Sequence, residues 1–147
     1  MRRHTLALTL AVMTVLVCAG CGVSYHHSLQ MPNFNYGELL DGHMGRVGQT
    51  LSSVRDLYSA RVASQQLKQI NIDLDDLVFN SSRLTPEGQM ELGKLAQKHL
   101  ETLGPVAAEM KSDATLSEMI SPELEVTLEH LRELVYRKVT AGAGTSD

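Results

Sequence analysis

Apolar residues recur at helical spacing through the first half of the chain. Between Leu40 and Val62 they return every three to four residues, with a shift of phase near Arg61, and this is the period of one face of an amphipathic helix. Asn35, followed by Glu38 three residues later, predicts the N-terminal cap of this helix. The apolar positions are Leu40, Met44, Val47, Leu51, Val54, Leu57 or Tyr58, and Val62.

The next segment fits two patterns. Leu67, Ile70, Leu74 and Leu77 have helical spacing, whereas residues 70–74 alternate between apolar and polar as a strand does. Because no partner strand is predicted elsewhere, we expect helix as far as about Leu77.

A well-marked helix start follows at Thr85–Glu87. It places a capping hydroxyl, a proline and an acid at the positions that favour them in a first turn. The predicted helix continues through an apolar face and stops at Gly104-Pro105, a typical helix end.

Ser121–Glu123 repeats the same start pattern, and an apolar stripe follows it. Between the two patterns, residues 106–120 predict short helical pieces, with Thr115 and Glu118 as a capping box. The residues of the final stripe are Leu124, Leu128, Leu131 and Val135.

One apolar stripe per helix must be buried against another element. The sequence therefore predicts a mainly α fold, an antiparallel helical hairpin or small helix bundle, over residues 36–140. Its core is aliphatic, because the 147 residues include four Tyr, two Phe and no Trp. Residues 21–35, polar and containing Pro32, predict a disordered tether, and residues 141–147 a disordered tail.

The N-terminus has the pattern of an export signal. Arg2 and Arg3 precede an uncharged run of twelve residues, Leu6–Val17, which is too short to span a bilayer. Ala19-Gly20-Cys21 then resembles the lipobox of bacterial lipoproteins. The resemblance implies that residues 1–20 are a signal peptide and that Cys21 is acylated. A plain membrane helix or an ordinary secretory signal are the alternatives.

The lipobox departs from its usual pattern at Cys18, where leucine is common. Cys18 and Cys21 are the two cysteines of the chain, so acylation and cleavage leave a domain with no thiol and no disulfide. Gly22, rather than aspartate, after the lipidated cysteine resembles outer-membrane sorting. In a cell with two membranes, the domain is therefore expected on the outer membrane, facing the periplasm.

Charge and motifs exclude several functions. Without residues 1–20 the 13 basic side chains fall to 11 against 17 acidic ones, and a net charge of about −6 argues against nucleic acid. Phosphate loops, hydrolase elbows and zinc-protease motifs are absent from the sequence. Asp73, Asp75 and Asp76 are read as solvated acids. We therefore expect neither an enzyme nor a cofactor.

Two histidine positions are candidate metal ligands. His26 and His27 are adjacent, with Met31 nearby, and histidine is a common ligand. Because no carboxylate joins them in the sequence, the interpretation is a solvated linker with no metal site. His99 is expected at the boundary of an apolar helix face.

Residues 77–100 contain a Phe-Asn-Ser element followed by Leu-Thr-Pro-Glu-Gly. This segment resembles the opening strand and first helix of OmpA-like peptidoglycan-binding domains. The later motif by which that family binds the cell-wall peptide has no counterpart here, so no binding residue is carried over. Helix-cap chemistry explains the same residues.

The expected function is a lipid-anchored envelope module of structural or protein-interaction type. Its expected partners are the lipid bilayer, through the acyl anchor, and an envelope protein or a second copy of the chain. The alternative is a lipoprotein that ties the membrane to peptidoglycan. Co-sedimentation with peptidoglycan sacculi distinguishes this alternative.

Overall fold

Four α-helices follow a short 3-10 turn in residues 24–143, the part of the chain that the computed structural model describes. Side chains are described for residues 24–137. The predicted signal peptide, residues 1–20, and the predicted lipidation site Cys21 lie outside this range. The elements are η2 (His27–Leu29), α2 (Tyr36–Ser52), α3 (Leu57–Ser81), α4 (Pro86–Ser112) and α5 (Ala114–Ala143).

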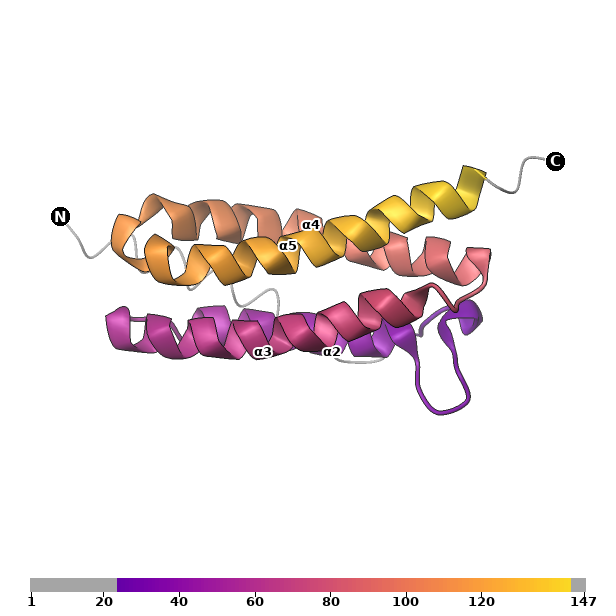
Figure 1. Ribbon diagram of the computed structural model, residues 1–147, viewed down its shortest axis with the longest axis horizontal. Coiled ribbons are helices and arrows are strands. Elements are labelled where there is room, and N and C mark those ends of the chain that lie inside the picture. The colour runs from indigo at the N-terminus through magenta and orange to yellow at the C-terminus, as the bar shows by residue number, and fades with distance from the viewer. Residues whose placement is uncertain (1–23, 144–147) are drawn as a thin grey trace.

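The helices form a small bundle of two hairpins. α2 pairs with α3 and α4 with α5, and the hairpins pack through α3 against α5 and α2 against α4 (Figure 1). This confirms the mainly α prediction. Asn35 caps α2 by accepting from the backbone N–H groups of Gly37 and Glu38, at 2.8 and 3.2 Å, as the sequence predicts.

The long helix predicted from residue 36 to about Leu77 is wrong in one respect, because it is broken at residues 53–56. Asp56 and Ser59 form a reciprocal capping box that starts α3. The guanidinium of Arg55 donates to the carbonyl of Ser52 at 2.6 Å, which satisfies one of the last carbonyl groups of α2. Polar side chains thus end one helix and begin another without a glycine or proline.

Two predicted helix boundaries at prolines are also wrong. α4 continues past Pro105 to Ser112, and Pro122 lies inside α5. An interior proline costs about 3 kcal/mol relative to alanine. Here the apolar face continues beyond each proline, through buried Val106, Ala107 and Met110 in α4 and through Leu124 in α5, and burial of these side chains offsets the cost.

The true α4–α5 connection is Asp113. Its carboxylate accepts from the backbone N–H groups of Thr115 and Leu116, at 3.0 and 3.3 Å, so Asp113 rather than Thr115 caps α5. The C-terminal tail predicted from Ala141 is helical as far as Ala143.

Residues 67–77 are helical, which settles the helix-or-strand ambiguity. One polar pair lies within the interface between α3 and α5. The hydroxyl of Thr127 donates to Oδ1 of Asn71 at 2.7 Å, and the Asn71 amide donates to the carbonyl of Glu123 at 2.8 Å. Since both Asn71 and Thr127 are buried, these bonds favour one register of α3 against α5.

The tether predicted over residues 21–35 is wrong for most of the described segment, residues 24–35, here named the strap. Leu29 is buried in the core, and Tyr25 and Met31 pack against it. The strap folds back along the start of α4, where it contributes the 3-10 turn η2 (Figure 1). Apolar side chains at positions 25, 29 and 31 give this polar-looking segment a reason to pack.

Among the described residues, none of the helices combines the length and apolar character needed to cross a bilayer.

Candidate functional site

The strap is held to the bundle by a polar cluster of three side chains. The hydroxyl of Tyr25 donates to Oδ2 of Asp41 in α2 at 2.6 Å, and the other oxygen of this carboxylate lies 2.6 Å from Nε2 of His99 in α4. The side chains of Asp41 and His99 are largely shielded from solvent. One carboxylate therefore joins the strap, α2 and α4.

These contacts change how the groups of the cluster ionise. Burial raises the pKa of Asp41, but hydrogen bonds from His99 and Tyr25, with the nearby positive charges, outweigh burial and lower it overall. Burial and the hydrogen bond to Asp41 raise the pKa of Tyr25 to about 12. The charged carboxylate and the neutral phenol are thus the favoured pair.

A second cluster lies one residue further along the strap. His26 and His27 approach Glu87 of α4, and one nitrogen or oxygen donor from each of the three residues lies within 4.8 Å of the other two. The solvated-linker interpretation of these histidines depends on there being no carboxylate near them. The position of Glu87 contradicts it. Positions 26 and 87 are far apart in the sequence. They come together because the strap folds back onto α4.

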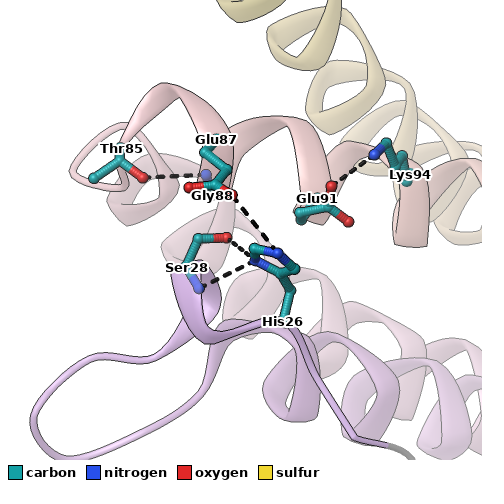
Figure 2. A network of polar contacts seen from close by, with 7 residues as sticks. All are labelled: His26, Ser28, Thr85, Glu87, Gly88, Glu91 and Lys94. Carbon is teal, nitrogen blue, oxygen red and sulfur yellow. Dashed lines mark hydrogen bonds and ion pairs between the residues drawn. The ribbon is translucent and has the colours of Figure 1, made fainter.

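Local geometry places both imidazole rings on the same side. His26 caps η2 and His27 is its first residue, and the ring centroids lie 4.4 Å apart. Nδ1 of His26 lies 2.8 Å from the hydroxyl of Ser28, and its Nε2 faces Glu87 Oε1 at 3.6 Å (Figure 2). That last distance is too long for a direct hydrogen bond.

A glycine makes the close approach of strap and helix possible. A Cβ atom at Gly88 would lie 2.6 Å from the carbonyl oxygen of Ser28, which is backbone and cannot rotate away. Gly88 also takes part in the N-terminal cap of α4, because its backbone N–H donates to the hydroxyl of Thr85 at 3.2 Å (Figure 2). The sequence marks Gly88 only as part of a helix start.

A third feature is the solvent-facing side of α3, here named the outer face. It carries five large apolar side chains whose exposed fractions run from 39% for Val62 to 78% for Tyr58. At about 100° per residue they fall within an arc of about 140°, opposite the buried face of the helix. These side chains are Leu57, Tyr58, Val62, Ile72 and Phe79.

The predicted continuation of the apolar stripe through Leu57 or Tyr58 and then Val62 is therefore wrong, because all three side chains are exposed. Because a new helix begins at Leu57, the rotational phase is reset, and Ala60 and Ala63 face the core in their place.

The predicted acids lie apart from both histidine clusters. Asp73 is paired with Arg46 of α2 at 2.7 Å, and this hydrogen bond lowers the pKa of Asp73. Asp75 and Asp76 are exposed on α3, in agreement with solvated acids. Arg46 also borders a depression of about 600 Å³ beside Phe34 and His43 at the start of α2.

The OmpA-like resemblance implies a strand at its start, but that strand is not formed. Residues 77–81 are the last residues of α3. The Thr85–Gly88 segment is a helix cap, as the local chemistry predicts.

No protein-family model, no curated protein and no solved structure matches this chain.

Proposed function

We propose that this chain is a lipid-anchored envelope module that acts through protein–protein contact, with Cys21 as its anchor and the outer face of α3 as its contact surface. The observation that carries this function is the exposure of five large apolar side chains on that face. Folded soluble domains rarely expose several large apolar side chains on one side of a helix unless a partner covers them.

The outer face has two apolar groups with polar residues between them. Leu57, Tyr58 and Val62 lie at the start of α3, and Ile72 and Phe79 lie further along it. Gln65 and Lys68 separate the groups on the same side. A helix laid along α3 has the shape to contact both groups, so a helical protein partner, including a second copy of this chain, suits this surface.

The anchor is short. Four residue steps separate Cys21 from Tyr25, and a fully extended chain covers at most about 3.6 Å per residue, or roughly 14 Å in all. Tyr25 is bound to α2 through Asp41. Acylation of Cys21 would therefore hold this end of the bundle close to the lipid headgroups.

Metabolic labelling with radioactive palmitate tests the anchor. The wild-type chain is expected to carry label in the membrane fraction, and Cys21→Ser is expected to lose it. Cys18→Ser is the matched control, because the other cysteine of the chain is then removed and label should remain. Label on Cys21→Ser, or none on the wild type, would contradict the proposed anchor.

Photo-crosslinking in intact cells tests the contact surface. A crosslinking residue at Ile72 is expected to give a defined product, and Phe79→Ser in the same chain is expected to weaken it. A crosslinker at Glu129, exposed on α5, is the control and should give none. A product of twice the chain mass indicates self-association. Equal products at the two positions, or none, would refute the outer face as the contact surface.

A further inference from the structure

We propose that His26, His27 and Glu87 bind a single divalent transition-metal ion, with Zn²⁺ as the best fit, and that this ion fastens the strap to α4. Two imidazoles and one carboxylate form a ligand set that zinc uses in proteins, with a fourth position left open. This inference does not depend on the proposed envelope function.

The donor atoms are almost close enough as they stand. Tetrahedral zinc with bonds of about 2.1 Å places its ligand atoms roughly 3.4 Å apart. His26 Nε2 and Glu87 Oε1 are 3.6 Å apart, and all three donors lie within 4.8 Å of one another. The site therefore needs shifts of up to about 1.4 Å, which rotation of the exposed His27 and Glu87 side chains can supply.

Nδ1 of His26 faces Ser28 and Nε2 faces Glu87 (Figure 2). Without a metal, Nδ1 accepts from the backbone N–H of Ser28 at 3.3 Å. Metal binding at Nε2 requires the other tautomer, in which the proton moves to Nδ1; that bond is then lost, and Nδ1–H donates to the hydroxyl of Ser28, 2.8 Å away. A metal-bound histidine typically donates its second N–H to such a neighbour, which fixes the ring. Ser28 is thus a positioning residue for the first ligand.

Glu87 supplies the negative charge of the site. Glu87 lies in the first turn of α4, where the partial positive charge of the helix N-terminus favours a carboxylate. This carboxylate also shields the cation from that positive charge. Glu91, one turn further along α4, is occupied by its ion pair with Lys94 at 2.6 Å (Figure 2), and it lies outside the ligand set.

The ligand types determine which cations fit. Imidazole nitrogen suits zinc, copper and nickel, whereas magnesium and calcium prefer sets of oxygen ligands. We therefore expect Zn²⁺, Cu²⁺ and Ni²⁺ to compete for the site and Mg²⁺ and Ca²⁺ to leave it unaffected.

Calorimetric titration of the full chain with Zn²⁺ tests the proposal. The chain is purified in detergent without a polyhistidine tag and is first freed of metal with EDTA. One Zn²⁺ per chain is expected to bind and to raise the midpoint of thermal unfolding. Glu87→Gln and His27→Gln are each expected to lower the affinity at least about tenfold, and Ser28→Ala about tenfold.

Matched controls carry the same changes elsewhere. Glu91→Gln alters the next glutamate of α4, and His130→Gln alters a histidine of α5. Both are expected to leave the affinity and the stoichiometry unchanged. Loss of binding in either control would overturn the assignment.

Gly88→Ala separates a built site from two exposed histidines that bind metal by themselves. The variant keeps all three ligands, but its new Cβ atom would lie 2.6 Å from the Ser28 carbonyl oxygen and would push the strap off α4. A drop in affinity of at least about tenfold is expected. Should the variant lose its helical circular dichroism, Glu87→Gln, which changes an exposed side chain, decides the question. Binding retained in Glu87→Gln, or no binding by the wild type, would overturn the proposal.

Discussion

Oδ1 of Asp41 in α2 lies 2.6 Å from Nε2 of His99 in α4. The second oxygen of the same carboxylate accepts a hydrogen bond from Tyr25 in the strap. A single part-buried carboxylate thus joins three segments that are distant in sequence. Its removal leaves two polar groups without their shared partner, which costs more than the loss of one surface contact.

Asp41→Asn should make the fold less stable and less sensitive to acid. Because the pKa of Asp41 is lowered from 3.8 in the folded chain, its contribution is fully present above that value and is lost as pH falls through the lower folded value. We expect a loss of about 2 kcal/mol at neutral pH. Urea unfolding from neutral to acidic pH should show a flatter slope for the variant below about pH 4. Equal slopes would contradict the role of Asp41.

Tyr25→Phe should change the alkaline limit of stability. The pKa of Tyr25 is raised from 10.0 to about 12, so its contribution is present below pH 10 and is lost as pH rises through about 12. The wild type should lose stability over that window more steeply than the variant. At neutral pH the variant should be less stable by about 1 kcal/mol. Urea unfolding at alkaline pH measures both effects, and parallel curves would count against the Tyr25–Asp41 bond.

Two glycines of α2 should respond to alanine in opposite directions. A Cβ atom at Gly37 would lie 2.4 Å from Cδ1 of Tyr25 and 3.1 Å from Cδ1 of Leu29, whereas one at Gly42 meets nothing within 4 Å. We expect Gly37→Ala to cost about 1–3 kcal/mol through overpacking and Gly42→Ala to add up to about 1 kcal/mol. Thermal unfolding of the pair gives the answer, and effects of the same sign would exclude close packing of the strap.

Pro122→Ala should stabilise α5. An alanine N–H at this position can donate to the carbonyl of Glu118, four residues earlier, and complete the helix ladder. The expected gain in the free energy of unfolding is about 1–3 kcal/mol. Pro32→Ala in the strap, outside any helix, is the control and should bring no gain. A gain for Pro32 alone would show that the interior proline carries no cost here.

Thr127→Val should destabilise the interface of α3 and α5. The variant keeps the shape of the side chain but leaves Oδ1 of buried Asn71 without the hydroxyl that bonds it. The expected cost is about 1–3 kcal/mol. Thr115→Val, at an exposed position of α5, is the matched control and should be close to neutral. Urea unfolding compares the two, and a neutral Thr127→Val would remove the pair as a stabilising contact.

Short-range chemistry made the helical architecture predictable. Asn35 and Thr85 cap helices where their sequence neighbours indicate, and the spacing of Leu67 and Leu74 is that of a buried helix face. The predicted helix ends are wrong where burial in the tertiary fold outweighs a local helix preference. Pro105 is a strong stop in isolation, yet burial of the residues that follow it carries the helix onward.

The candidate metal site shows a different limit. The sequence shows His26 and His27 as donors, but Glu87 lies sixty positions after His27, where its place in a first helical turn accounts for it. The strap lies against α4 because Leu29 packs into the core and because Asp41 joins Tyr25 to His99. Such a pairing follows no periodic or local pattern, because it depends on the tertiary fold.

The close approach of Ser28 to position 88 also limits how this sequence can diverge. Any descendant that keeps the strap in place must keep glycine at position 88 or shift residue 28 together with it. Position 42 carries no such restriction and can drift freely among helix-forming residues. Unequal substitution at these two glycines would therefore reveal, in a lineage of related chains, whether the folded-back strap is an inherited feature.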